Sequence, residues 1–545
     1  MTDRTPRPDA DVCVIGAGPA GALVAHELAT GGHSVVVLEA GPRPDFDDRP
    51  AREERALRPG APPPWEMGEG GGHGDRDAYA STGPRAYPLD RARVKAVGGS
   101  TLHWQGMVMR LHERDFRLQS ETGLGVDWPL SYADLRPYYA RAERAMGVAG
   151  ASDNPFAPPR ERPFPLPAFP PSHSDAIFAE ACESLGITTH SVPNARNSTP
   201  YMGRGECRGY GTCKPVCPSG AKYDATAHVD RAEAAGARVL DRAPVQRLEH
   251  DDAGERVTAA VYATPDGATH RQGAREFVLA AGGVETPRLL LLSDSPQYPD
   301  GLANDSGAVG RYFTDHFFAG VGGVIDRPTR QHHVGFNTTE SHQFYDRPAD
   351  GSRTAIKLEF HNYAGPTPAD VALSGSALGD DLLDEIRREY GNHLAVGALV
   401  EQVPQYENRI GLDESRTDDH GNPVPDVRWS LDDLTRRTIE RANGIQRAIL
   451  DELDADVRWV VGPENAGPAF HHMGTTRMGT DPARSVVGPD MRTHALSNLT
   501  IAGSSVFPTT GAMNPTLTIA ALSLYATDRL SDRLAEEPAG TTSRP

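Results

Sequence analysis

A glycine-rich turn near the start of the chain constrains the fold more than any other feature. Gly16, Gly18 and Gly21 have the spacing G-x-G-x-x-G, and they stand between an apolar run at 11–15 and a stretch of helix formers at 20–29. In this arrangement the first glycine permits a tight turn, the second lets the backbone approach a pyrophosphate, and the third lets the helix pack on the strand. The sequence therefore predicts a β-α-β unit that binds a dinucleotide at the start of its helix.

An acidic residue strengthens this prediction. Glu39 directly follows a second β-branched run at 35–38, where a carboxylate can accept a hydrogen bond from a ribose hydroxyl. The motif alone does not separate FAD from NAD. Its position at the beginning of a long chain, with later glycine motifs returning to it, favours FAD.

Length, charge and hydropathy limit the classes of protein to which this chain can belong. A chain of 545 residues predicts two domains, and its net charge of −19 excludes a nucleic-acid partner, because phosphate binding relies on a basic surface. No stretch approaches the roughly 20 apolar residues that span a bilayer, which predicts that the protein is not an integral membrane protein. The first residues have no apolar signal region, so we expect a cytoplasmic location, or export and membrane association through a partner subunit.

Lysine is scarce in the sequence. Four lysines stand against 51 arginines, a bias that either salt adaptation or a GC-rich genome would produce. The bias leaves these two explanations open and indicates nothing about the chemistry.

Local signals predict several further elements. Ser131 is expected to cap a helix, Asp266-Gly267 to form a hairpin turn, and Ser430 to open a helix that runs to about Leu453. A Pro/Gly-rich stretch at 58–75 is expected to cross the surface without regular structure.

Several further motifs follow the glycine turn along the chain. They include VGGST at 97–101, AGG at 281–283, VGR followed by DH between 309 and 316, HHMGTTRMG from 471 and GAMNPT from 511. Together with the first glycine turn, these motifs resemble those of the glucose-methanol-choline (GMC) family of FAD oxidoreductases. The resemblance implies an enzyme that acts on CH–OH donors.

The resemblance also implies the architecture. We expect an α/β fold with a Rossmann-like FAD-binding domain assembled from residues 1–125, 220–318 and 462–545. A connecting segment at 126–219 would carry a cysteine-rich loop. A substrate-binding α+β domain at 319–461 would contribute an antiparallel sheet over the flavin.

Further flavin contacts follow from matching the family motifs residue by residue. They are Gly98, Gly99, Ser100, His103, Val245, Gly503, Asn514, Pro515 and Thr516. The His103-Trp104 pair has the spacing of family members that attach FAD covalently through a histidine. Related dehydrogenases carry the same pair without an established bond, so covalent attachment and simple packing beside the flavin both remain open.

A histidine and an asparagine are expected to carry the catalysis. Oxidation of an alcohol requires a base for the hydroxyl proton, and a histidine with a pKa near neutrality suits that role. The resemblance assigns the base to His471 and its partner to Asn514, although Asn514 could instead form a turn before Pro515. His472 is a less favoured candidate for the base, because neighbouring side chains on a strand point to opposite faces.

Three of the five cysteines crowd into one glycine-rich run. Cys207, Cys213 and Cys217 form a C-x5-C-x3-C-P pattern, whose thiolates could converge on one metal centre. Zinc is less natural, because structural zinc sites usually have four ligands. The run resembles the segment that holds a three-iron (3Fe-4S) cluster in flavoprotein subunits of bacterial sugar and gluconate dehydrogenases. Free thiols or another metal remain the alternative.

The combined prediction is a dehydrogenase that oxidises an alcohol group of a sugar, sugar acid, polyol or glycoside. Electrons would leave through the 3Fe-4S cluster to a cytochrome or quinone, and a small companion subunit is expected. One alternative is a pyranose or glycoside oxidase that uses oxygen. A second alternative is a non-catalytic electron-transfer or assembly subunit.

Overall fold

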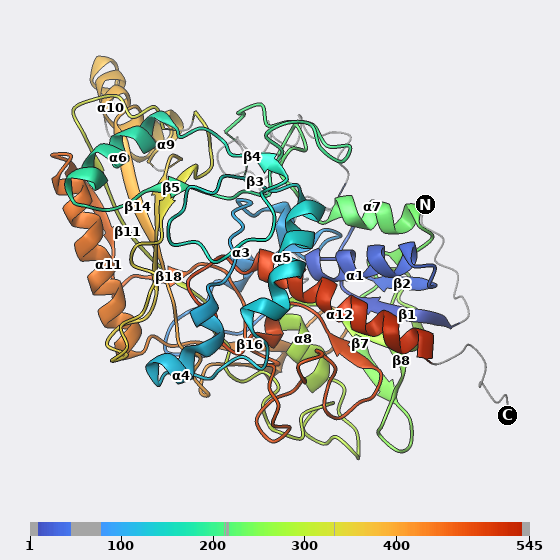
Figure 1. Cartoon of the computed structure of the whole chain (residues 1–545). Coiled ribbons are helices and arrows are strands. Elements are labelled where there is room, and N and C mark those ends of the chain that lie inside the picture. The colour runs from blue at the N-terminus through green and yellow to red at the C-terminus, as the bar shows by residue number, and fades with distance from the viewer. Residues whose placement is uncertain are drawn as a thin grey trace.

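The computed structural model describes residues 9–44, 78–211, 213, 217–331, 333–363, 365–375 and 377–536. The predicted surface stretch at 58–75 lies outside these residues. Two sheets organise the rest of the molecule. A parallel sheet with α1 and α12 lies at one end of the view in Figure 1, and an antiparallel sheet with α11 lies at the other.

The parallel sheet has five strands in the order β19-β10-β1-β2-β6. Their bounds are β1 Ala10–Ile15, β2 Val35–Leu38, β6 Arg238–Leu240, β10 Ala274–Leu279 and β19 Leu499–Ile501. The strands are buried on both faces, which explains their continuous apolar runs. Helices α1 (Pro19–Thr30), α5 (Tyr132–Met146), α7 (Thr226–Ala234) and α12 (Thr516–Glu536) pack together beside them. This part confirms the predicted Rossmann-like α/β domain.

The antiparallel sheet has seven strands, six of them in the order β17-β11-β14-β13-β12-β5, with β18 paired to β11. Their bounds are β5 His190–Ser191, β11 Phe317–Val324, β12 Thr339–Ser341, β13 Ile356–His361, β14 His393–Val400, β17 Asp456–Val461 and β18 Gly467–Pro468. Helix α11 (Asp433–Asp451) packs on β11 and β14. The antiparallel sheet in the substrate domain is therefore confirmed. Because β5 and β18 fall outside 319–461, the predicted domain boundaries stay a prediction.

Smaller elements complete the fold. A three-stranded sheet comprises β7 (Val245–His250), β8 (Val257–Ala263) and β9 (Thr269–Gln272), with the predicted turn at Asp266-Gly267 between the last two. The other helices and strands are α3 Leu89–Ala92, η2 Gly99–Leu102, η3 Glu113–Arg117, α4 Leu118–Thr122, β3 Ala149–Gly150, β4 Leu166–Pro167, α6 His173–Ser184, α8 Gly282–Leu291, α9 Pro368–Ser374, α10 Asp380–Tyr390, β15 Arg409–Thr417, β16 Pro423–Arg428 and η4 Ser504–Val506.

The two predicted helix caps have different outcomes. Ser131 caps α5, where its side chain accepts a hydrogen bond from the Asp134 backbone N–H. The predicted start of α11 is wrong by two residues, because Asp432 is the cap. Its carboxylate accepts from the Thr435 N–H over 2.9 Å, whereas the Ser430 hydroxyl donates to the Asn408 Oδ1.

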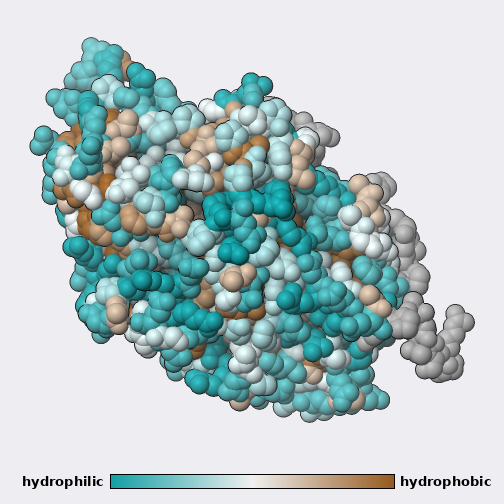
Figure 2. All heavy atoms as spheres, in the orientation of Figure 1, coloured by the Kyte–Doolittle hydropathy of each residue, from teal (hydrophilic) through white to brown (hydrophobic). Residues whose placement is uncertain are grey.

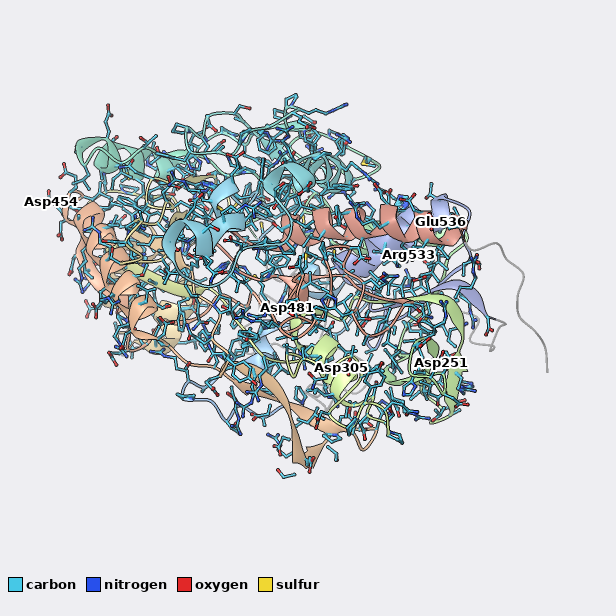
Figure 3. The ribbon with its side chains drawn as sticks, turned by 60° about the horizontal axis from the view of Figure 1, so that its bottom comes forward. Asp251, Asp305, Asp454, Asp481, Arg533 and Glu536 are labelled. Carbon is cyan, nitrogen blue, oxygen red and sulfur yellow. The ribbon has the colours of Figure 1, made fainter. Side chains whose placement is uncertain are left out.

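The surface is mostly polar. Figure 2 shows hydrophilic residues over most of one face, with apolar residues scattered among them. Asp251, Asp305 and Asp481 are spread across the view of Figure 3. None of the helices in the described residues is long and apolar enough to cross a membrane.

Candidate active site

One large cavity lies between the parallel sheet and the antiparallel sheet. Its volume is about 1000 Å³, and residues from the ends of β1 and β2, from η2, β7, α8 and β13, and from the loops at 467–472 and 502–504 line it. Twelve predicted site residues lie on its wall: Gly16, Gly18, Glu39, Gly99, Ser100, His103, Val245, His471, Gly503, Asn514, Pro515 and Thr516. The fold therefore brings residues from both ends of the sequence to one site.

The first glycine turn has the geometry that a dinucleotide requires. A Cβ on Gly21 would lie 2.0 Å from the Gly16 carbonyl oxygen, so this glycine lets α1 pack against the turn. A Cβ on Gly18 would meet nothing within 4 Å, which leaves the backbone open to the cavity. Because α1 begins at Pro19, its unpaired N–H groups lie at the same place and suit a pyrophosphate.

Glu39 lies at the end of β2, on the cavity wall. Its two carboxylate oxygens accept from the backbone N–H groups of Ala17 and Gly41, each over 2.8 Å. Burial raises the pKa of Glu39 to about 7, against the opposing effect of these hydrogen bonds. A carboxylate can accept about four hydrogen bonds, so capacity remains for a ribose hydroxyl.

Two predicted contact residues, Gly21 and Gly98, lie behind the wall and not on it. Gly98 donates its N–H to the Ala17 carbonyl over 3.0 Å and has a φ of +102°. This backbone conformation favours glycine and turns the chain into η2, which carries Gly99 and Ser100 to the cavity. Gly98 and Gly21 therefore shape the site, and a direct contact with the cofactor stays a prediction for both.

A second histidine fixes the proton on His471. The His316 Nε2 lies 2.8 Å from the Gly511 carbonyl oxygen, and because a carbonyl only accepts, this nitrogen must carry a hydrogen. The Nδ1 of neutral His316 therefore holds a lone pair. It lies 2.9 Å from the His471 Nδ1, which must donate to it. The lone pair of His471 is thereby placed on Nε2, the ring nitrogen left for the cavity.

Burial keeps both imidazoles neutral. It lowers the pKa of His471 well below the usual value, and the neighbouring His316 and Lys357 lower it further. Burial also lowers the pKa of His316 to about 4. At neutral pH His471 is therefore a proton acceptor with a defined tautomer, and the backbone N–H of His471 donates to Asp315 over 2.9 Å.

His472 also lines the cavity, so the sequence argument that separated the two histidines does not apply. They lie on an irregular segment and not on a strand, directly after Phe470 with its positive φ of +67°. Their surroundings still differ. The His472 ring packs 5.6 Å from the Tyr87 ring and 6.1 Å from the Phe313 ring, whereas His471 bonds to His316.

Lys357 holds Asn514 in one orientation. The Lys357 Nζ donates to the Asn514 Oδ1 over 2.7 Å, which leaves the Asn514 Nδ2 as a hydrogen-bond donor. No contact joins Asn514 to His471 directly among those the structure defines, but both lie on the same cavity wall. The pair predicted from sequence is therefore brought together with complementary roles, one acceptor and one donor.

Strand β13 supplies polar groups that the sequence analysis missed. Its residues are all buried. Ile356, Leu358 and Phe360 join the apolar core, and the alternate residues Lys357, Glu359 and His361 form a polar row. Lys357 pairs with Glu359 over 2.7 Å and with Glu340 over 3.4 Å, and it is fully buried at 0% exposure. In the sequence, the signal for this polar row was a lysine that alternates with apolar residues in a chain with few lysines.

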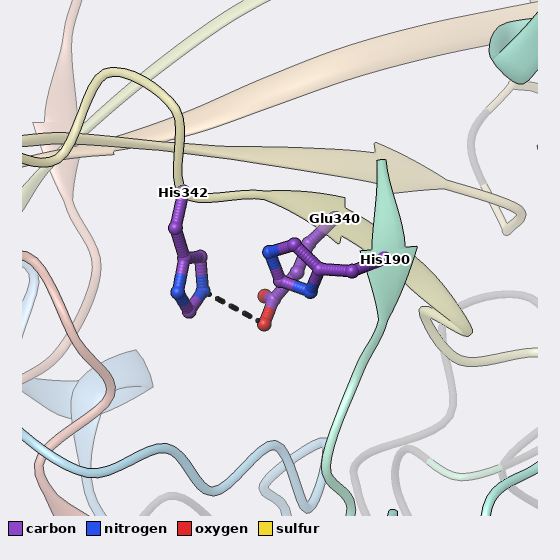
Figure 4. Close-up of side chains that lie close together, drawn as sticks. All are labelled: His190, Glu340 and His342. Carbon is purple, nitrogen blue, oxygen red and sulfur yellow. Dashed lines mark hydrogen bonds and ion pairs between the residues drawn. The ribbon is translucent and has the colours of Figure 1, made fainter. Parts of the chain in front are cut away.

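Glu340 belongs to a buried cluster with His190 and His342 (Figure 4). Their ligand atoms lie within 4.8 Å of one another, the only such group of three in the described chain. Asn154 accepts from the Phe156 N–H, so its Nδ2 donates to the His342 Nδ1 over 2.9 Å. The His342 Nε2 therefore carries the hydrogen that it donates to Glu340 over 2.9 Å. Because that nitrogen is protonated, a hydrogen-bonded network is favoured over a metal site.

The cysteine-rich loop lies behind the His103-Trp104 loop. Cys213 and Cys217 are buried, and Cys207 is half-buried. Burial would raise the pKa of Cys217, but the Lys222 backbone N–H donates to its Sγ over 3.4 Å, and this and other polar contacts hold the pKa below the usual value. The three sulfur atoms do not all lie within 4.8 Å of one another.

Comparison with known proteins agrees with this architecture. Family models described as GMC oxidoreductase match residues 78–318 and 404–523, and a model described as FAD binding domain matches residues 9–49. The fructose dehydrogenase large subunit of Gluconobacter japonicus is 35% identical, with 97% of this chain covering 98% of that protein. The 2-methyl-1,2-propanediol dehydrogenase of Mycolicibacterium austroafricanum is 31% identical, with 96% of each chain covered.

A solved structure supports the fold alone. The pyridoxine 4-oxidase from Mesorbium loti superposes with a TM-score of 0.64 at 20% identity, over 96% of this chain and 99% of that one. The parallel sheet, its glycine turn and the neighbouring polar cavity define an FAD-binding oxidoreductase. Within that class, the chain belongs to the GMC oxidoreductase family, an enzyme family that acts on CH–OH donors.

Proposed function

We propose that this protein is an FAD-dependent dehydrogenase that oxidises an alcohol group of a sugar, sugar acid, polyol or glycoside. One observation carries the proposal: the hydrogen bond from His471 to His316 leaves the His471 Nε2 as a proton acceptor on the cavity wall. A buried imidazole in this state is a suitable general base for a hydroxyl group.

The two catalytic side chains divide the work. The His471 Nε2 removes the hydroxyl proton while the Asn514 Nδ2 donates a hydrogen bond to the same oxygen and holds it in place. FAD, when bound, accepts the hydride that leaves the carbon. The alcohol thus loses one proton and one hydride and becomes a carbonyl compound. Lys357 fixes the Asn514 amide, so that the donor and not the carbonyl faces the substrate oxygen.

The polar row on β13 supports a polyhydroxylated substrate. Glu359 and His361 line the cavity and offer a carboxylate and an imidazole for hydrogen bonds with further hydroxyl groups. The names of the two curated relatives, a fructose dehydrogenase and a propanediol dehydrogenase, agree with a substrate that carries several hydroxyl groups. Cofactor contacts are assigned to the eleven wall residues other than His471, with Gly21 and Gly98 shaping the turns.

The electrons are proposed to leave through a 3Fe-4S cluster held by Cys207, Cys213 and Cys217. Zinc–thiolate bonds of about 2.3 Å would place tetrahedral sulfur ligands only about 4 Å apart. The three sulfur atoms do not all lie within 4.8 Å of one another, which disfavours a single zinc ion, and the C-x5-C-x3-C-P pattern supports the iron–sulfur cluster. A cytochrome or quinone is the proposed acceptor. A companion subunit is supported by the words "large subunit" in the name of the Gluconobacter relative.

The test begins with anaerobically purified protein. Iron, acid-labile sulfide and flavin are measured, and about three irons per flavin are expected for the proposed cluster. Flavin bleaching is then followed with a panel of sugars, sugar acids and polyols, in wild type and in His471→Ala.

Each part of the proposal can fail separately. Flavin without iron, even after reconstitution, would exclude the cluster, and peroxide release with oxygen would then favour the oxidase. Unchanged bleaching in His471→Ala would exclude the assigned base. A flavin that no alcohol in the panel bleaches would favour the non-catalytic subunit.

A further inference from the structure

Two buried cations accompany the cysteine-rich loop. Arg196 is 0% exposed and Lys222 is 2% exposed. Within the described residues, neither of them pairs with a carboxylate. Lys357, the other fully buried lysine of the described chain, differs because it pairs with two carboxylates.

The guanidinium of Arg196 is incompletely bonded. One terminal nitrogen donates to the Gln105 carbonyl over 3.1 Å, whereas Nε and the other terminal nitrogen are buried without a hydrogen-bond partner. The ring of Phe336 lies 3.6 Å from the guanidinium carbon and covers one face. Arg196 forms an antiparallel bridge with Lys222, and the next residue, Asn197, accepts a hydrogen bond from the Cys207 N–H over 2.9 Å, so Arg196 lies beside the cysteine-rich loop.

Among the described residues, the ammonium of Lys222 bonds only to carbonyl oxygens. Its Nζ donates to Leu102 over 3.1 Å, to Trp104 over 2.8 Å and to Cys213 over 2.8 Å. These bonds satisfy its hydrogens but contribute no negative charge. The same residue donates its backbone N–H to the Cys217 sulfur over 3.4 Å.

Two unpaired buried charges need an anion. Removing an ion from water costs several kcal/mol even after relaxation, unless an opposite charge lies close by. Three neutral thiols would not compensate Arg196 and Lys222. Three thiolates that bind an iron–sulfur core would do so, because the thiolate charges exceed the positive charge of the core.

We propose that Arg196 and Lys222 are the counter-charges of the cluster held by Cys207, Cys213 and Cys217, and that they raise its reduction potential. This inference rests on the proposed cluster. A fixed positive charge stabilises the reduced state, which carries one more electron, over the oxidised state. Both residues are therefore positioning and tuning residues, and neither reacts with the substrate.

Lys222 has a second consequence for electron transfer. Its ammonium joins the backbone on either side of His103, at Leu102 and Trp104, to the backbone of Cys213. His103 lies on the cavity wall where the flavin is expected. One buried side chain therefore sets the spacing between the flavin loop and the cysteine-rich loop.

The experiment compares neutral substitutions with charge-keeping ones in the full-length holoprotein. The variants are Lys222→Met, Lys222→Arg, Arg196→Met and Arg196→Lys. Arg208→Gln serves as the matched control, because this arginine of the same loop is 65% exposed and pairs with Glu206. Flavin content and thermal unfolding establish that each variant folds. Iron per flavin and an EPR-monitored redox titration of the cluster are the readouts.

We expect both neutral variants to bind less iron per flavin than wild type. In the fraction that retains the cluster, we expect the reduced state to be disfavoured at least tenfold, which is 59 mV for a one-electron couple. The charge-keeping variants should recover most of the iron content, and Arg208→Gln should resemble wild type.

Two results would overturn the inference while leaving the cluster in place. One is wild-type iron content and potential in both methionine variants. The other is an equal loss of iron in the methionine and the charge-keeping variants, which would make shape and not charge the requirement. Iron-free wild-type protein is a different failure, because it removes the proposed cluster itself and with it the anion that the two cations would compensate.

Discussion

Lys357 and Lys222 are two fully buried lysines, and their surroundings differ in charge. Lys357 contacts two carboxylates, those of Glu340 and Glu359, and the Asn514 amide oxygen. Lys222 contacts three backbone carbonyls. Within the described residues, the first cation therefore forms ion pairs with carboxylates and the second forms none.

The difference separates two kinds of buried charge. At Lys357 the cation serves the protein, since it fixes the Asn514 amide and holds two carboxylates in place. At Lys222 the described residues provide no ion pair, and the negative charge is proposed to come from the cluster.

The largest expected effect is on catalysis, in the part of the site where Lys357 orients Asn514 and His471 is the base. We expect His471→Ala to lower kcat/KM about 10²- to 10⁴-fold, the usual contribution of a general base. His472→Asn is the matched neighbour, and its effect should be much smaller because this ring packs against Tyr87. Steady-state kinetics with the best alcohol substrate measures both. A larger loss in the His472 variant would reverse the assignment.

Stability in iron-free protein tests the two lysines directly. Lys357→Met leaves Glu340 and Glu359 without their cation, which should lower the free energy of unfolding by about 3–5 kcal/mol. Lys222→Met strands no carboxylate and only leaves three backbone carbonyls without their donor, so its cost in the same iron-free protein should be smaller, about 1–3 kcal/mol. Denaturant unfolding of chelator-treated protein measures the difference. Equal destabilisation of the two variants would contradict the contrast.

Loss of the neighbouring imidazole should have an intermediate effect. His316→Phe removes the acceptor that fixes the His471 tautomer, and we expect kcat/KM to fall about 10- to 100-fold, as when the orienting partner of a functional histidine is removed. Flavin content should be unchanged, since His316 bonds to His471 and Gly511. A variant with full activity would show that the tautomer does not need this partner.

The smallest expected effect is that of pH on the wild-type enzyme. The base works in its neutral form and becomes protonated only when the pH falls below its own pKa. Burial holds the pKa of His471 well below its usual value of 6.5, so kcat/KM should stay nearly constant from pH 8 to pH 6. A plot of log kcat/KM against pH provides the measurement. An acid limb centred near pH 6.5 would mean that the histidine is accessible to water.

The distance along the chain between interacting residues explains which features could be predicted from the sequence. The glycine turn, Glu39 at the end of β2 and the three clustered cysteines were accessible from sequence, because each depends on residues close together in the chain. His316 was part of a recognised motif, but its bond to His471 was not predicted. The cap of α11 was placed two residues early because Ser430 and Asp432 are both good capping residues, and only the helix start decides between them.

The sequence by itself determined the β-α-β unit, the family and the residue types of the site, since these follow from short-range spacing. Only the tertiary structure decided which polar side chains meet. It places Lys357 against Asn514 across 157 positions of the chain and His316 against His471 across 155. Such pairs set the orientation of an amide and the tautomer of an imidazole. They form only when the two sheets pack around one cavity, because a buried polar group bonds to the partner that the fold places beside it.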